Sequence, residues 1–184
     1  MVDIRIIKTK ENIVDAFFLI LEWENYQDMT VEQICQYARC SRSTFYSYYS
    51  NKEDVLKQIV DRYMTRFNQY IKNRFSKITD FENLLSKLIT ELIFPERKNI
   101  HKIIHIESNN YGLSIKFEVF CKDVFISYYS DIPSKNILGE LYGTCAVVIL
   151  KNIVDGQFNK NDIKVINELQ QSLFNSPIFK SQYH

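Results

Sequence analysis

Six of the eight residues from Ser41 to Tyr48 carry a hydroxyl group. Hydroxyl groups hydrogen-bond to phosphates and to base edges, and the methyl group of Thr can contact thymine. Ser, Thr and Tyr are weaker helix formers than Ala or Leu, so their concentration in a short predicted helix needs a functional reason. A helix that enters the major groove of DNA supplies one, because there the hydroxyl groups face their binding partners.

Charge is segregated around this segment. Residues 39–52 contain Arg39, Arg42 and Lys52 and no acidic residue, whereas the seven acidic residues of positions 1–52 all lie upstream. The net charge of the whole chain is only +1. A broadly basic face, which is typical of DNA-binding proteins, is therefore not expected, and the number of phosphate contacts should be small.

Two short helices are predicted to position the hydroxyl-rich segment. Thr30 and Gln33 have the spacing of a capping box, which predicts a helix that buries Ile34. Ser41 is a good N-cap for the next helix, which should end near Tyr48. Two short helices joined by a tight turn form a helix-turn-helix. A helical packing module with no DNA role is the alternative for the same residues.

The rest of the chain predicts an all-α fold of about nine helices. Gly and Pro are scarce, at four and three residues, and apolar residues recur at helical spacing. Thr9 should cap the first helix, and Asn51 should cap a long fourth one. Pro95 should end a fifth helix, and Asn161 should cap the ninth.

The predicted helices divide into two domains. Residues 1–52 should form a three-helix DNA-binding domain of the helix-turn-helix class. Residues 53–184 should form a helical domain for ligand binding and dimerisation, with a long eighth helix that ends at Asp155-Gly156.

Residues 9–60 resemble the N-terminal domain of the tetracycline-repressor (TetR) family. The resemblance rests on Ser41-Arg-Ser-Thr-Phe-Tyr46, on Thr30-Val31 before it and on Asn51-Lys52-Glu53 after it, all in one register. The family usually has Gly at the position of Arg39, where the backbone takes a positive φ, and a non-Gly residue there costs about 1 kcal/mol. The remainder resembles the family in helix number and length, with a short C-terminal domain like those of Gram-positive members.

The resemblance implies a homodimer that binds double-stranded DNA, with each protomer reading one half-site of a palindromic operator. Thr30 should cap its helix against a phosphate, and Lys52 should bind phosphate from the start of the fourth helix. Phe45 and Tyr49 should pack inward. The predicted DNA contacts are Thr30, Arg39, Arg42, Ser43, Thr44, Tyr46, Ser47, Tyr48 and Lys52.

The C-terminal half predicts an effector cavity and a dimer face. The predicted cavity is lined by Phe94, His105, Phe117, Phe120 and Cys121, although aromatic side chains at this spacing also form cores. Gly139 and Gly143 let another helix approach closely, either in the partner protomer or in the same chain. The predicted dimer face comprises Gly139, Tyr142, Gly143, Ala146, Ile149, Ile166 and Leu169.

No metal or cofactor is expected. His101 and His105 lie four residues apart, a spacing that can place two imidazoles on one metal, but we interpret them as solvated or pocket-lining side chains. Cys35 should be buried and inert, and Cys121 and Cys145 should be small core residues. The four cysteines show neither ligand nor disulfide spacing.

The sequence predicts a regulator and not an enzyme. It contains no catalytic constellation with a recognisable frame. It contains no signal peptide and no run of 18 apolar residues, so we expect a cytoplasmic protein without a membrane anchor. The predicted function is a repressor that a small-molecule effector releases from its operator. A regulator whose C-terminal domain binds a protein partner is the first alternative, and a helical enzyme or structural bundle is the second.

Overall fold

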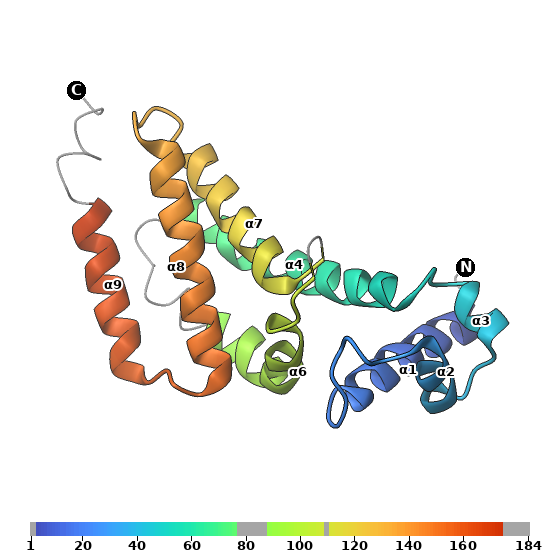
Figure 1. The fold of residues 1–184 in the computed structure, drawn as a ribbon. Coiled ribbons are helices and arrows are strands. Elements are labelled where there is room, and N and C mark those ends of the chain that lie inside the picture. The colour runs from blue at the N-terminus through green and yellow to red at the C-terminus, as the bar shows by residue number, and fades with distance from the viewer. Residues whose placement is uncertain (1–2, 77–87, 109–110, 175–184) are drawn as a thin grey trace.

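The computed structural model describes residues 3–76, 88–108 and 111–174, which form helices and connecting turns with no β-strand among them. Figure 1 shows the three N-terminal helices at one end of the chain and the C-terminal helices grouped at the other. The all-α prediction is confirmed.

The N-terminal helices are α1 (Ile4–Ile20), α2 (Val31–Ala38) and α3 (Arg42–Tyr46). Fully buried side chains from all three, among them Phe17, Ile34 and Phe45, form their common core. The prediction that Thr9 caps α1 is wrong. The helix begins earlier because the Asp3 side chain accepts a hydrogen bond from the Arg5 amide at 2.9 Å, whereas the Thr9 hydroxyl lies inside the helix and donates to the Arg5 carbonyl.

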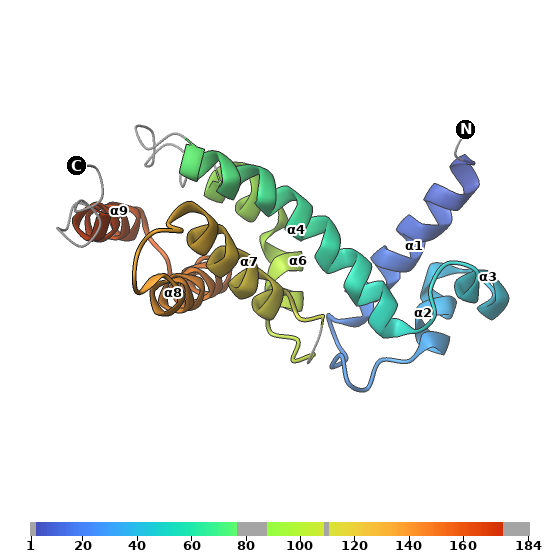
Figure 2. The same cartoon turned by 90° about the horizontal axis from the view of Figure 1, so that it is seen from above.

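Helix α4 (Lys52–Ser76) belongs to both halves of the chain. Asn51 precedes it, and its side chain accepts a hydrogen bond from the Asp54 amide at 2.8 Å, as predicted for a cap. Figure 2 shows α4 running from the three N-terminal helices to the C-terminal group. Toward the C-terminal end of α4, the centre of the Phe67 ring lies 4.9 Å from the centre of the Phe117 ring.

The C-terminal group contains the π-helical segment η2 (Leu88–Ile93), α6 (Phe94–Ile104), α7 (Leu113–Tyr128), α8 (Lys135–Asp155) and α9 (Lys160–Phe174). Part of the predicted fifth helix lies outside the described residues. Pro95 stands in the first turn of α6, where its missing N–H is not needed, so it begins a helix where we expected only an end.

Two helix ends of this group can be compared with their predicted caps. Gly156 follows α8 with φ of 80°, the left-handed conformation expected of a C-terminal cap. For α9, the side chain of Asn159 accepts hydrogen bonds from the Asn161 and Asp162 amides. Asn159 therefore caps this helix, and the prediction of Asn161 is wrong by two residues.

Helices α7 and α8 lie side by side, and both glycines of α8 are used in this contact. A Cβ atom on Gly143 would lie 2.6 Å from the Glu118 carbonyl oxygen, and one on Gly139 would lie 2.9 Å from Ile126. The Tyr142 ring lies 5.4 Å from that of Phe125 in α7. Gly139, Tyr142 and Gly143 therefore contact α7 of the same chain, and their predicted place in a dimer face stays a prediction.

Lys102 connects the two halves away from α4. Its Nζ atom donates to the Phe18 carbonyl oxygen and to a Glu22 carboxylate oxygen of the α1 region, each at 2.9 Å. The hydrogen bond and the attraction of Lys102 lower the pKa of Glu22. The end of α6 is thereby attached to the end of α1.

One described helix, α8, is long and apolar enough to cross a membrane by length and composition. A core helix of a soluble protein passes the same test, and 33% of the apolar window of α8 is buried within this chain.

Candidate nucleic-acid interface

Helix α2 begins at the predicted capping box. The Thr30 hydroxyl accepts from the Gln33 amide at 3.2 Å, and the Gln33 side chain accepts from the Thr30 amide at 2.7 Å. Ile34, Cys35 and Ala38 point into the core. This anchoring fixes the direction of α2 and the position of the turn that follows it.

The turn between α2 and α3 depends on Arg39. Its φ of 53° and ψ of 44° place it in the left-handed region, and it is the one described non-Gly residue with positive φ. Its backbone amide donates to the Gln36 carbonyl and the Cys40 amide to the Cys35 carbonyl, which satisfies the end of α2. The predicted left-handed conformation is confirmed. Because Arg39 has a Cβ atom, this conformation retains the free-energy cost that a glycine would avoid.

Helix α3 is organised by the Ser41 hydroxyl. It accepts from the Thr44 amide at 3.0 Å and lies 2.8 Å from the hydroxyl oxygens of both Ser43 and Thr44. The Ser47 hydroxyl donates to the Ser43 carbonyl. In the free protein three of the predicted DNA-contacting hydroxyls are therefore held by bonds within the chain, which orders them before any ligand arrives.

The two faces of α3 differ sharply. Phe45 is fully buried and Tyr49, just beyond the helix, is 3% exposed, whereas Tyr46 is 51% exposed. Arg39 and Arg42 are also exposed, and neither forms an ion pair among the described residues. A free phenol and two free guanidinium groups thus lie at and beside the outer face of the helix.

Lys52 occupies an unexpected environment. Its Nζ atom donates to the carbonyl oxygens of Tyr26, Gln27 and Met29 at 2.7 to 2.9 Å and lies 4.9 Å from the centre of the Tyr26 ring. An ammonium group has three N–H donors, so all three are used to hold the segment between α1 and α2. The predicted phosphate contact would need at least one of these bonds to break.

Lys10 is the feature that the sequence reasoning missed. It lies on α1, and its Nζ atom is 5.6 Å from the centre of the Tyr48 ring, which places a cation beside the end of α3. Because α1 begins at Ile4, exposed Arg5 and Lys8 project from the same helix. For the earlier start of α1 the signal was Asp3, a good N-cap residue upstream of Thr9.

The cysteines of this domain suit packing better than chemistry. Cys35 is buried, and desolvation together with the neighbouring Cys40 raises the pKa of its thiol to about 11. A thiol with so high a pKa forms little of the reactive thiolate. Cys121 is also buried, but Cys145 is exposed on α8, so its assignment to the core is wrong.

The residues of the predicted effector cavity differ in exposure. Phe94 is 54% exposed, whereas Phe117 and Cys121 are buried in the core and Phe120 is half-buried. One open cavity, of about 780 Å³, is lined by Phe94, and a second, of about 490 Å³, by His105. Neither of these two cavities is lined by Phe117, Phe120 or Cys121, and a pocket shared by all five residues stays a prediction.

Comparisons with known proteins agree with the geometry of α2 and α3. Residues 20–59 match the family described as bacterial regulatory proteins, tetR family. A 97-residue stretch is 29% identical to YxbF, an uncharacterized HTH-type transcriptional regulator of Bacillus subtilis (strain 168); it covers 50% of this chain and 25% of that protein. The match thus spans about a quarter of the length of that relative.

The fold as a whole is similar to that of the dihydroxyacetone kinase operon activator DhaS. The TM-score is 0.58 at 21% identity, over 91% of this chain and 98% of that one. At this identity the similarity shows the fold alone. Together with the family match, it extends the resemblance from the N-terminal helices to the arrangement of α4 and the C-terminal group. Residues 20–59, which include α2 and α3, are therefore similar to the helix-turn-helix segment of the tetR family of bacterial regulatory proteins.

Proposed function

We propose that the chain is a homodimeric transcriptional regulator that binds a palindromic operator through α3. The observation that carries this proposal is the exposed side chain of Tyr46 on a helix whose start is fixed by Ser41 and whose opposite face is buried through Phe45. A helix held in this way can present side chains to a major groove without losing order on binding.

The contacts fall into two kinds. Tyr46, Ser43 and Thr44 are the proposed base-edge readers. The hydroxyl oxygens of Ser43 and Thr44 can still accept a hydrogen bond while bonded to Ser41, and the phenol of Tyr46 can donate or accept. Arg39 and Arg42 are the proposed phosphate contacts, joined by Lys10 from α1. Tyr48, Ser47 and the Thr30 cap lie beside these groups and complete the proposed backbone contacts.

The dimer face is proposed on the outer side of α8 and α9. Ile137, Leu141 and Val148 of α8 are 53–63% exposed, and Val165 and Leu169 of α9 are about as exposed. Ala146, Ile149 and Ile166, which the sequence predicts for the same face, are half-buried and pack against the core of the same chain. An apolar surface of this kind favours association, and a second copy of the same surface would cover it in a two-fold dimer.

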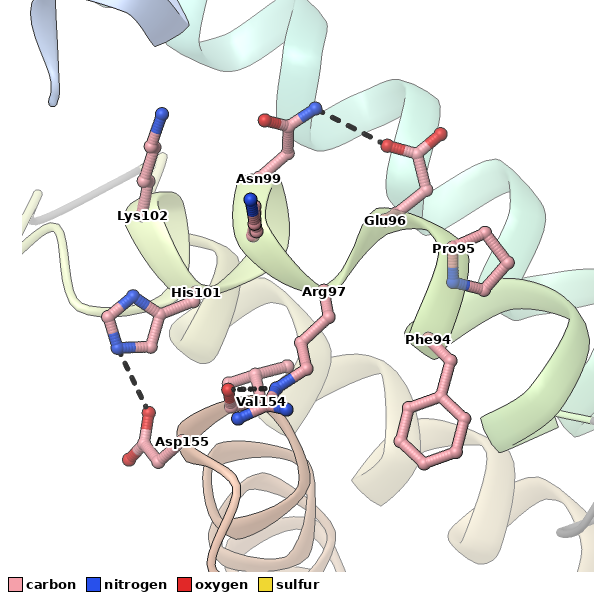
Figure 3. Close-up of a pocket in the computed structure, with 10 residues that line it drawn as sticks. Phe94, Pro95, Glu96, Arg97, Asn99, His101, Lys102, Val154 and Asp155 are labelled. Atoms are coloured by element: carbon pink, nitrogen blue, oxygen red, sulfur yellow. Dashed lines mark hydrogen bonds and ion pairs between the residues drawn. The ribbon is translucent and has the colours of Figure 1, made fainter.

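Release from DNA is proposed to follow binding of a small molecule in the C-terminal half. The open cavity of about 780 Å³ lies between the start of α6 and the end of α8, lined by Phe94, Arg97 and Val154 among others. Figure 3 shows the Arg97 and Phe94 side chains on the side of α6 that faces α8. A ligand there would act on DNA binding through α6, because Lys102 of the same helix holds α1.

Protein binding is the alternative to a small molecule. Ile115 and Val119 expose 43% and 50% of their surface on α7, apart from the proposed dimer face. The sign of regulation is a separate question, since the structurally similar DhaS is an activator by name and we propose repression. A reporter gene under the selected operator, with and without the regulator, distinguishes the two signs.

The decisive experiment is selection of bound duplexes from a random pool, followed by fluorescence anisotropy at several salt concentrations. We expect an imperfect palindrome with half-site centres about one helical turn or somewhat more apart, and an affinity that falls as salt rises. Absence of salt-dependent duplex binding would overturn the proposal and favour a helical packing module.

A further inference from the structure

Two histidines near the end of α6 and one aspartate at the end of α8 converge on one point. The Nε2 atom of His105 lies 3.0 Å from Oδ1 of Asp155, and the Nε2 atom of His101 lies 3.4 Å from the same oxygen. One potential ligand atom from each of the three residues lies within 4.8 Å of the others. We propose that His101, His105 and Asp155 form a site for a divalent transition-metal ion such as Zn²⁺.

The separations suit a metal ion of this size. Zinc binds imidazole nitrogen and carboxylate oxygen at about 2.0–2.2 Å, and tetrahedral ligands at that distance lie roughly 3.4 Å apart. The distance of 3.4 Å from His101 to Asp155 equals this value, and the distance of 3.0 Å from His105 is somewhat shorter. The two imidazoles, whose ring centroids are 5.2 Å apart, place one nitrogen each within 4.8 Å of the other, so the two rings must move closer to bind one ion.

The types of ligand select among metals. Two neutral imidazoles and one carboxylate suit zinc and its neighbours, whereas Mg²⁺ and Ca²⁺ prefer sets made of oxygen. All three side chains are partly open to solvent, so a water molecule can supply a fourth ligand.

The backbone around Asp155 is fixed before any metal binds. Gly156 takes a left-handed conformation, and a Cβ atom there would collide with the Arg97 guanidinium group. The Nε atom of Arg97 donates to the Val154 carbonyl oxygen at 2.7 Å. Figure 3 shows this bond next to the contact between His101 and Asp155. The end of α8 is therefore held against α6 in the register that places Asp155 beside both imidazoles.

Nearby cations limit the strength of the site. Arg97, Lys98 and Lys102 line the same cavity as His101 and Asp155, and their charges oppose a divalent cation. Binding must therefore rest on coordination by the imidazole nitrogens and not on negative charge, which again favours Zn²⁺ over Ca²⁺.

A simpler reading of the same contacts is a pair of hydrogen bonds from two imidazoles to one carboxylate. The two readings differ in one measurable respect, because only a metal site binds Zn²⁺ with one ion per chain. This property does not depend on DNA, so its failure and a failure of the proposed regulatory function are distinguishable.

The test uses the full chain, purified without a histidine tag and treated with a chelator that is then removed. Competition for Zn²⁺ against a chromophoric chelator gives the stoichiometry and affinity. We expect one ion per chain and a loss of at least about tenfold in affinity in His105→Gln and in Asp155→Asn. The control Glu107→Gln removes a nearby exposed carboxylate outside the trio and should bind as the unmodified chain does.

A second measurement separates loss of the site from loss of the fold. Thermal unfolding without metal should be closely similar in the chain and its variants, whereas added Zn²⁺ should raise the Tm only where the trio is intact. Equal Zn²⁺ affinity in the chain and in Asp155→Asn, or no binding by the chain at all, would overturn the proposal.

Discussion

The Nζ atom of Lys52 lies 2.9 Å from the Tyr26 carbonyl oxygen and directly above the ring of the same residue, 4.9 Å from its centre. Two further carbonyls, of Gln27 and Met29, complete its hydrogen bonds. The first residue of α4 thus holds the segment that leads into α2. A position expected to bind DNA has a structural task in the free protein.

Substitution of Lys52 tests that task. Lys52→Ala leaves three carbonyl groups without their donor, so we expect the free energy of unfolding to fall by about 1–3 kcal/mol, measured by urea denaturation. Lys57→Ala removes an exposed cation from the same helix and should change the stability little.

The salt dependence of DNA binding tests the phosphate contact predicted for the same residue. If Lys52 binds phosphate, Lys52→Ala should lower the salt slope by about one and weaken binding to all duplexes alike. An unchanged slope with lowered stability would leave Lys52 as a purely structural residue.

Arg39→Gly should separate stability from DNA binding. Gly removes the strain of the left-handed conformation at the expense of greater chain entropy when unfolded, so we expect a net gain of roughly 0.5 kcal/mol. Loss of the guanidinium group should weaken binding to DNA duplexes of every sequence alike. An Arg39→Gly variant that is less stable than the unmodified chain and binds DNA with equal affinity would contradict both the strain and the phosphate contact assigned to Arg39.

Tyr46→Phe tests the phenol hydroxyl alone. The ring keeps its edge contact with Phe45, 5.5 Å away between centroids, so the fold should be unchanged. If the hydroxyl binds a base edge, affinity for the selected operator should fall by about 1 kcal/mol, or roughly fivefold, while affinity for random duplex stays the same. Equal losses on both duplexes would identify a backbone contact instead.

Val148→Asp tests the proposed dimer face. Val148 is 53% exposed in the single chain, so a charge there should leave the protomer folded but oppose burial in a dimer. We expect the dissociation constant of the dimer to rise on the order of 100-fold, measured by analytical ultracentrifugation. Val119→Asp, at a similarly exposed site on α7, should remain dimeric. Dissociation by Val119→Asp alone would move the interface to α7.

The helix starts that the sequence predicted correctly are those set by a capping residue. Thr30, Ser41 and Asn51 each cap the helix that follows, because a cap depends only on residues two or three positions away. The positive φ of Arg39 was predicted from the resemblance and is confirmed. The start of α1 was missed although it depends on the equally local cap at Asp3.

Contacts between distant segments could not be read from the sequence. Gly143 was correctly identified as a point of close approach, but spacing does not say whether the approaching helix belongs to the same chain, and here it is α7. His105 and Asp155 are 50 residues apart along the chain, so no spacing rule joins them. The effector residues stay a prediction for the same reason, since aromatic side chains in a core and in a cavity have the same periodicity.

The attachment of α1 to α6 through Lys102 bears on the operator itself. With α4 shared between the two halves and Lys102 holding α1, each reading head has little freedom to swivel about a linker. One base pair inserted between the half-sites would rotate one of them by about 34° around the DNA axis. A regulator whose DNA-binding domains are joined by flexible linkers could still bind both half-sites after such an insertion. In the proposed dimer the domains are held rigidly, so we expect the insertion to lower the affinity for the operator.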